Sequence, residues 1–235
     1  MLQINHFTKC FGDKVAVDDL SLHIKPGEIY GFIGHNGAGK TTTLKSVVGI
    51  QPFDQGEILI DGHSIADEPL ACKAEIAYIP DNPDLYEFMT GIQFLNFIGD
   101  VFGVSEEQRQ AEIEQLTSMF GIMNDLNTPI SQYSHGMKQK LAITSALMHH
   151  PKLMVMDEPF VGLDPVATHQ LKTIMRTLCD QGTAIFFSTH VLEVAERLCD
   201  KVAIIKGGKL VRSGTMEEVK GDASLESVFL ELEER

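Results

Sequence analysis

The chain has 235 residues, of which 43% are hydrophobic and 22% are charged; these values are typical of a soluble globular protein with one large α/β domain or two small ones. Its formal net charge of −14 argues against a nucleic-acid partner, because nonspecific nucleic-acid binders carry a basic face. No apolar run approaches the ~20 residues that a membrane-spanning helix needs, and residues 1–10 lack the layout of a signal peptide.

The N-terminal part of the chain is predicted to form short strands separated by glycine turns. The expected strands cover residues 2–7, 17–24, 28–33 and 56–60. A helix should begin after Gly39 and run through Leu44 and Val48.

From about residue 85 to residue 150 the pattern becomes helical. Ser105 with Gln108 predicts a capping box, in which each side chain binds a backbone N–H of the other residue. Ile113, Leu116 and Phe120 then follow at helical spacing.

Strands and helices alternate again after residue 150. The expected strands cover residues 153–156, 184–188 and 202–205, and the expected helices follow Asp164-Pro165 and cover residues 192–198 and 224–232. The first of these helices should bury a stripe of Leu171, Ile174 and Leu178. Short apolar strands that alternate with helices imply a mostly parallel sheet covered on both faces. The helical stretch is therefore expected to be an insertion into an α/β core.

One glycine-rich segment predicts a phosphate-binding loop. Gly34-His35-Asn36-Gly37-Ala38-Gly39-Lys40-Thr41 fits G-x-x-x-x-G-K-[ST] and lies between a predicted strand and a predicted helix. Its glycines let successive backbone N–H groups turn inward around phosphate oxygens. Lys40 should reach the β- and γ-phosphates of ATP, and the Thr41 hydroxyl should ligate Mg²⁺. The predicted contacts to the nucleotide in this segment are Gly34, His35, Asn36, Gly37, Ala38, Gly39, Lys40, Thr41 and Thr42.

Two acids follow the apolar strand that ends near Met156. The carboxyl ends of buried strands lie at the edge of the sheet where ligands bind. We therefore expect Asp157 to hold Mg²⁺ through water and Glu158 to polarise the water that attacks the nucleotide. Together with the phosphate loop, these acids predict a P-loop NTPase.

Four further segments resemble the motifs of the ABC ATPase family, in the order that the family has them. Residues 133–140, Tyr-Ser-His-Gly-Met-Lys-Gln-Lys, resemble the signature, which is usually leucine-serine-glycine-glycine-glutamine followed by basic residues. Gly162-Leu163-Asp164 resembles the D-loop, Ser188-Thr189-His190 the switch-histidine segment, and Phe11-Gly12 the aromatic A-loop that stacks on adenine. The resemblance covers essentially the whole chain.

The resemblance implies a fold as well as an activity. It implies an α/β P-loop NTPase (RecA-like) core with a mostly parallel sheet, an N-terminal antiparallel β-subdomain and an inserted α-helical subdomain at about residues 82–150, all within one domain of residues 1–235. It also implies a head-to-tail homodimer or heterodimer that binds ATP between the phosphate loop of one subunit and the signature of the other. Ser134 and the Gly136 amide would then point at the γ-phosphate from a helix N-terminus. Lys40, Glu158 and His190 would be the catalytic residues.

The chain departs from the family pattern at three places. Asp81 replaces the usual Q-loop glutamine; it can still bind Mg²⁺ but cannot donate as an amide does. In the signature, His135 replaces a glycine and Met137 replaces the glutamine, while the serine hydroxyl and the second glycine are kept. Phe11 replaces the commoner tyrosine and keeps its stacking face; it is alternatively a core residue, with Phe7 stacking in its place.

Three segments, residues 133–139, 158–165 and 224–232, resemble ATPases of bacterial exporters for antibiotics, peptides or lipids. An integral membrane permease subunit would dock near residues 81–95, where Tyr86, Phe88 and Met89 are either apolar contacts or core residues. The chain would be cytoplasmic and peripheral on the inner face of the membrane, and its four scattered cysteines fit that compartment. The alternative is a soluble ABC ATPase that acts on ribosomes, DNA or cofactor assembly. A pseudo-ATPase is disfavoured because Lys40, the two acids and His190 are all present.

Overall fold

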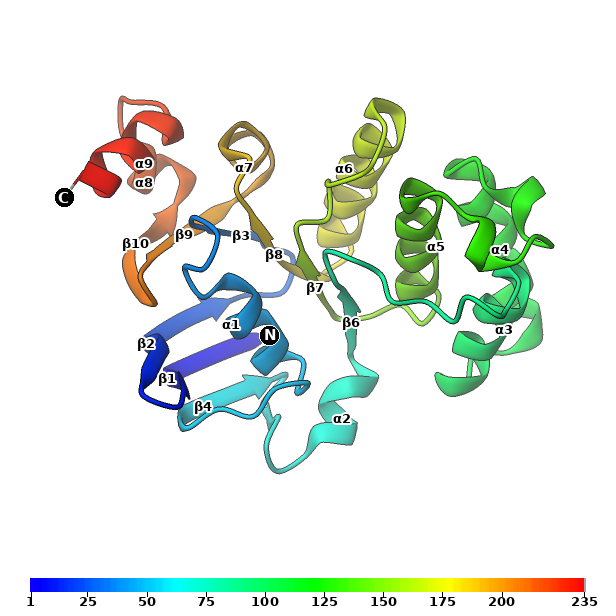
Figure 1. Cartoon of the computed structure of the whole chain (residues 1–235), viewed down its shortest axis with the longest axis horizontal. Coiled ribbons are helices and arrows are strands. Elements are labelled where there is room, and N and C mark those ends of the chain that lie inside the picture. The colour runs from blue at the N-terminus through cyan, green and yellow to red at the C-terminus, as the bar shows by residue number, and fades with distance from the viewer. Residues whose placement is uncertain (235) are drawn as a thin grey trace. The chain divides into compact units, whose positions relative to one another are not determined.

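The computed structural model describes residues 1–234, and the side chains of residues 1–232 (Figure 1). By their contacts the residues form two compact units. The first comprises Met1–Tyr78, Lys152–Pro159 and the chain from Met175 onward, and the second comprises Ile79–Pro151 and Phe160–Ile174. Within the described residues, no helix has both the length and the apolar character needed to cross a bilayer.

The N-terminal part of the first unit is an antiparallel sheet of four strands in the order β2-β1-β4-β5. Its strands are β1 (Leu2–Phe11), β2 (Lys14–Ile24), β4 (Gln55–Ile60) and β5 (His63–Ser64). Strand β1 continues four residues beyond the predicted end because Thr8 pairs with β4 and Lys9 to Phe11 pair with β2, as far as a turn at Gly12.

A second sheet of six strands has the order β10-β9-β3-β8-β7-β6. Its strands are β3 (Ile29–Ile33), β6 (Ile76–Ile79), β7 (Leu153–Asp157), β8 (Ala184–Thr189), β9 (Lys201–Lys206) and β10 (Lys209–Thr215). Strand β3 is parallel to β8 and β9, β7 is parallel to β8, and β10 is antiparallel to β9. The predicted α/β class, with a mostly parallel sheet and an antiparallel N-terminal sheet, is confirmed.

Helix α1 (Lys40–Val47) is held in the core of the first unit. One buried cluster contains Ile4 and Phe7 of the antiparallel sheet, Leu44 of α1, and Phe32 and Phe186 of the larger sheet. Burial of apolar side chains this large stabilises the fold by about 1.5–3 kcal/mol each. Helix α1 is therefore anchored by apolar contacts to both sheets.

The other helices of the first unit lie beside the sheet or near the C-terminus. They are α2 (Pro69–Ala74), α7 (Leu192–Leu198), α8 (Met216–Lys220) and α9 (Leu225–Glu234). Helix α9 buries Leu225, Val228 and Phe229, which confirms the amphipathic closing helix, whereas Leu232 is only half-buried.

The second unit is mainly helical, as predicted for residues 85–150. Its helices are α3 (Gly91–Val101), α4 (Glu106–Met119) and α5 (His135–Leu147), with short 3₁₀ turns at Met123–Asp125 and Ile130–Gln132. These helices gather in one group, drawn in green in Figure 1. Helix α6 (Pro165–Asp180) begins in this unit and ends in the first.

Two details of the sequence prediction were wrong. The structure shows only half of the capping box at Ser105: its Oγ accepts from the Gln108 N–H, but it then donates to the Gln108 side-chain oxygen at 3.0 Å. The box fails because that oxygen binds the hydroxyl and not the Ser105 N–H. In α6 the buried residues are Ala167, Leu171, Met175 and Cys179, at a spacing of four, and Ile174 and Leu178 are only half-buried. The small Ala167 and Cys179 side chains lie on the packed face, which a search for large apolar residues misses.

Candidate functional site

The phosphate loop joins β3 to α1 and has a backbone that requires glycine. Gly37 and Gly39 have φ values of 81° and 112°, a region that side chains other than glycine rarely adopt. A Cβ at Gly34 would lie 2.5 Å from the Ile205 carbonyl oxygen, and one at Gly39 would lie 2.8 Å from the Ala16 carbonyl oxygen. The loop is thus closely packed by its neighbours, while Gly37 has open space around it.

Lys40 is buried at the first turn of α1, with 6% of its surface exposed. Its Nζ donates to the carbonyl oxygens of Gly34 at 2.5 Å and His35 at 3.3 Å, and it lies 3.7 Å from Glu158 Oε1. Burial lowers the pKa of Lys40, and the nearby charges of Glu158 and Asp157 oppose that shift. The ammonium group is therefore held inside the loop, facing the two acids.

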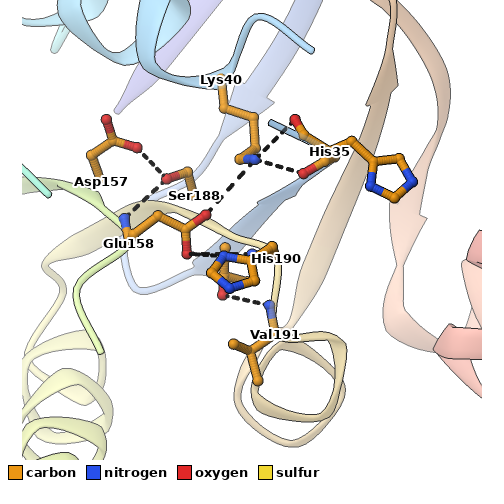
Figure 2. Close-up of polar contacts among 9 residues, drawn as sticks. His35, Lys40, Asp157, Glu158, Ser188, His190 and Val191 are labelled. Carbon is orange, nitrogen blue, oxygen red and sulfur yellow. Dashed lines mark hydrogen bonds and ion pairs between the residues drawn. The ribbon is translucent and has the colours of Figure 1, made fainter. Parts of the chain in front are cut away.

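Strand β7 ends at the two predicted acids, and Ser188 of the adjacent strand β8 connects them (Figure 2). Ser188 pairs with Asp157 in the parallel register. Its Oγ donates to Asp157 Oδ1 at 2.5 Å and accepts from the Glu158 N–H at 3.0 Å. Because Ser188 and Asp157 are both almost fully buried, this hydroxyl fixes the direction of the Asp157 carboxylate.

Glu158 has a left-handed backbone, with φ 49°, at the point where the chain leaves the sheet. Its Oε2 lies 3.0 Å from His190 Nδ1 and accepts from the His190 N–H at 3.3 Å. Its Oε1 is buried and has no hydrogen-bond partner among the described residues, although Lys40 lies nearby as an ion pair. A buried carboxylate oxygen without a donor is costly, and a bound water could supply the missing donor.

The structure distinguishes the two aromatic candidates of the A-loop. Phe11 is 51% exposed at the end of β1, beside the turn at Gly12. Phe7 is fully buried and contacts the edge of Phe53, with ring centroids 5.7 Å apart. The alternatives that Phe7 stacks on the nucleotide or that Phe11 is a core residue were therefore wrong.

The signature residues form a second group, within the second unit. Ser134 is the N-cap of α5, and its Oγ accepts from the Met137 N–H at 3.2 Å. The ring of His135 packs against Gly162, and a Cβ at Gly136 would lie 2.9 Å from the Gly162 carbonyl oxygen. The signature is thus in contact with the D-loop of the same unit. Asp81, also in this unit, is exposed after β6.

The structure thus brings five side chains together in the first unit, four of them predicted to act on the nucleotide and the fifth from Ser188. They are Lys40, Asp157, Glu158, Ser188 and His190. The role of Ser188 was missed by sequence reasoning, although its position two residues before His190, on the strand beside β7, was a usable signal.

Comparison with known proteins identifies the family. Residues 17–161 match the family model described as ABC transporter. The chain belongs to the ABC transporter family. It is 33% identical over 237 residues to the ABC-type transporter ATP-binding protein EcsA of Bacillus subtilis (strain 168), covering 99% of this chain and 96% of that protein. It is 35% identical over 213 residues to the Nod factor export ATP-binding protein I of Paraburkholderia xenovorans, covering 91% of this chain and 70% of that protein.

Solved structures agree with this assignment. The structure of an ATP binding subunit of an ABC transporter matches with a TM-score of 0.95 and 34% identity, covering 99% of both chains. A dimeric ATP-binding cassette bound to ADP and Pi matches with a TM-score of 0.84 at 23% identity, covering 92% of this chain and 99% of that chain, and supports the fold alone. The chain is therefore an ATP-binding subunit of the ABC type with the P-loop NTPase fold, in a family of ATPases.

Proposed function

We propose that this chain is the ATP-hydrolysing subunit of an exporter, and that it works as a head-to-tail dimer on an integral membrane permease. The observation that carries the proposal is the Glu158 carboxylate, which lies between Lys40 and His190 at the carboxyl end of β7. Support for export comes from the names of two relatives, the Nod factor export protein and the linearmycin resistance ATP-binding protein LnrL of Bacillus subtilis (strain 168).

In the proposed mechanism the first unit supplies the hydrolytic groups. The loop amides of residues 34–42 and the Lys40 ammonium bind the phosphates, and Phe11 stacks on the adenine. Glu158 Oε1, which has no hydrogen-bond partner among the described residues, accepts a hydrogen bond from the attacking water and polarises it. His190, fixed by Glu158 Oε2, contacts the γ-phosphate and helps to position that water.

Magnesium fits the oxygen donors of this site. Within the described residues, no three His, Cys, Asp or Glu side chains converge as a metal cluster, so the ion would rely on few protein ligands. The Thr41 hydroxyl and the Asp157 carboxylate are the hard oxygen donors that Mg²⁺ prefers, whereas the contact expected of Asp81, a residue of the second unit, stays a prediction. The ion would neutralise part of the phosphate charge.

The second unit is proposed to complete the site of a neighbouring subunit. The Ser134 hydroxyl and the Gly136 amide stand at the N-terminus of α5, where a helix favours anions. We propose that they contact the γ-phosphate bound by the other subunit of a homodimer or heterodimer. ATP binding would thereby close the dimer, and hydrolysis would reopen it.

An exposed aromatic patch of the second unit is the proposed docking surface for the permease. Phe88 is 81% exposed and Tyr86 is about half exposed, with their ring centroids 5.8 Å apart. Tyr86 also contacts Phe97 of α3, at 5.6 Å. Phe88 is thus not a core residue, whereas the Tyr86 ring also contacts the buried Phe94 at 6.2 Å and Met89 is half-buried. Clustered exposed aromatic residues are typical of protein contacts, and a cytoplasmic segment of the membrane subunit is the occupant we propose.

The test is affinity purification of Glu158→Gln from its native cells, in detergent with ATP. The substitution should slow hydrolysis and retain the ATP-bound state. We expect an integral membrane protein to co-purify in stoichiometric amount, because the chain is proposed to bind it at the inner face of the cell membrane. Recovery of ribosomal, DNA-bound or cofactor-assembly proteins without a membrane protein would overturn the transport proposal. The same purification with Phe88→Ser added should lose the membrane protein and keep ATP binding.

A further inference from the structure

We propose that Lys9 and Asp54 are positioning residues for the nucleotide base, because together they hold the Phe11 ring in place before the nucleotide binds. The inference rests on the proposed stacking of Phe11 on adenine. It adds two residues that no motif in the sequence indicates.

Lys9 is buried to an extent that is unusual for a lysine. Only 8% of its surface is exposed, although it lies near the end of β1. A buried ammonium group needs a partner, and the Asp54 carboxylate provides one at 3.3 Å. Lys9 therefore does not extend into solvent, and its charge is held at a fixed place beside the A-loop.

The Lys9 ammonium lies against the ring of Phe11. Its Nζ is 5.3 Å from the ring centroid, within the range of a cation–π contact. The two residues are two positions apart on β1, so that their side chains leave the same side of the strand. One face of the exposed Phe11 ring is thus covered by a cation, which leaves the other face for a base.

One carboxylate oxygen of Asp54 binds both Lys9 and the neighbouring residue Cys10. Its Oδ2 receives the Lys9 ammonium and also accepts from the Cys10 N–H at 2.6 Å, and the Asp54 N–H donates to the Thr8 carbonyl oxygen at 3.0 Å. The Cys10 N–H and Lys9 lower the pKa of Asp54, which shows that both contacts favour the charged carboxylate. The residue between Lys9 and Phe11 is therefore anchored as well.

This arrangement affects binding through preorganisation. An exposed phenylalanine would otherwise lose rotamer freedom when a base stacks on it, and this loss weakens binding. A ring that is already ordered by Lys9 loses less. The gain in affinity should therefore appear for ligands that contain a base and be absent for the phosphate chain alone.

The experiment measures dissociation constants of ATP and of tripolyphosphate by calorimetry, on the full chain, with EDTA to prevent turnover. Phe11→Ala is the benchmark and should weaken ATP binding by about five- to tenfold, as expected for loss of base stacking, without changing tripolyphosphate binding. Lys9→Met should weaken ATP binding by roughly two- to fivefold with the same selectivity, and Lys9→Arg should restore it. Asp54→Asn removes the charge from a half-exposed residue and gives a second test if Lys9→Met fails to fold.

The double variant Lys9→Met with Phe11→Ala decides whether Lys9 acts through the ring. If it does, the double variant binds ATP no more weakly than Phe11→Ala alone. The inference is overturned if Lys9→Met also weakens tripolyphosphate binding, adds its full effect to Phe11→Ala, or leaves ATP binding unchanged. If Phe11→Ala itself has no effect on ATP binding, the stacking proposal fails first, and this inference fails with it.

Discussion

The two parts of the proposed ATP site differ in how their functional groups are held. In the first unit Lys40, Asp157 and Ser188 are almost fully buried; Ser188 is hydrogen-bonded to both acids, and Lys40 forms an ion pair with Glu158. In the second unit Ser134 and His135 are exposed at the N-terminus of α5, and the main contact of Ser134 is a helix cap. The phosphate side is thus a preformed internal network, whereas the signature side is a surface.

This difference explains why the signature tolerates departures from the family pattern. A buried ionic network depends on each member, because removing one partner leaves another charge buried without compensation. At the signature, the cap uses the backbone N–H of Met137 and not its side chain, so that the glutamine can be replaced. His135 fills space against Gly162, which a glycine at position 135 would leave open.

The largest effect is expected from Glu158→Gln and Lys40→Ala in the buried network. Each should lower ATP hydrolysis by at least about 100-fold, because each removes a group that acts on the reacting phosphate or water. Phosphate release at saturating ATP measures the loss. Glu193→Gln is the control: Glu193 is exposed on α7 and pairs only with Arg197, so it should leave the rate unchanged. Turnover within twofold of the parent in Glu158→Gln would contradict the assigned role.

A smaller effect is expected from Ser134→Ala on the exposed side. The change should cost about 1 kcal/mol of unfolding free energy through the lost cap. It should also lower ATP hydrolysis about 10- to 100-fold through the lost phosphate contact. Ser105→Ala is a matched control, since Ser105 caps α4 with a similar bond to the Gln108 N–H. The two variants should lose similar stability, and only Ser134→Ala should lose activity. Equal activity in both would show that Ser134 is only a cap.

Ser188→Ala tests whether the buried network depends on its unpredicted member. The change leaves the Asp157 carboxylate without the donor of Ser188, at a cost of about 1–3 kcal/mol in unfolding free energy, while the Glu158 N–H keeps the Ser188 carbonyl oxygen at 3.2 Å. We expect hydrolysis to fall roughly tenfold, because the acids lose their alignment. Ser145→Ala removes another buried hydroxyl, bonded only to the Ala142 carbonyl oxygen, and should leave hydrolysis unchanged. Loss of stability without loss of rate in Ser188→Ala would reduce Ser188 to a structural role.

The smallest expected effect is a change in the pKa of Asp164, at the start of α6. Its pKa is lowered by the hydrogen bond from Lys140 Nζ, 2.9 Å away, and by the Ala167 N–H. A carboxyl group with a lowered pKa stabilises the fold at pH values above its unfolded pKa, and this contribution disappears as the pH falls through the folded pKa. In Lys140→Met the titration midpoint of Asp164, followed by carboxyl NMR, should rise towards the ordinary value. Lys172→Met should leave it unchanged, and an equal midpoint in parent and Lys140→Met would contradict the assigned cause.

Much of the fold was predictable because its strands and helices have strong local patterns. Helix α7 has the predicted bounds, and the Asp164 cap is present, with the Ala167 N–H donating at 2.9 Å. Strand β10 was not predicted because its residues are mostly polar and exposed at the edge of the sheet, where no apolar alternation marks them. The true capping boxes, Thr90 with Gln93 and Thr215 with Glu218, were also missed.

In the candidate site, the residues that could be predicted were those that belong to a motif with fixed spacing along the sequence. Lys40 and Asp157 belong to motifs that can be found in one segment each. Ser188, Lys9 and Asp54 act through partners that are distant in the sequence, so that their contacts come from the sheet register and the loops. For Ser188 the sequence offers one signal, its place two residues before His190, whereas Lys9 and Asp54 lie in no motif.

The most direct test of the account is the molar mass of Glu158→Gln in solution, measured by light scattering with and without Mg²⁺ and ATP. We expect a monomer without nucleotide and a dimer with ATP, and we expect Ser134→Ala added to Glu158→Gln to remain largely monomeric. A monomer at saturating ATP, under conditions where calorimetry shows the nucleotide bound, would contradict the claim that the exposed signature completes a neighbour's site.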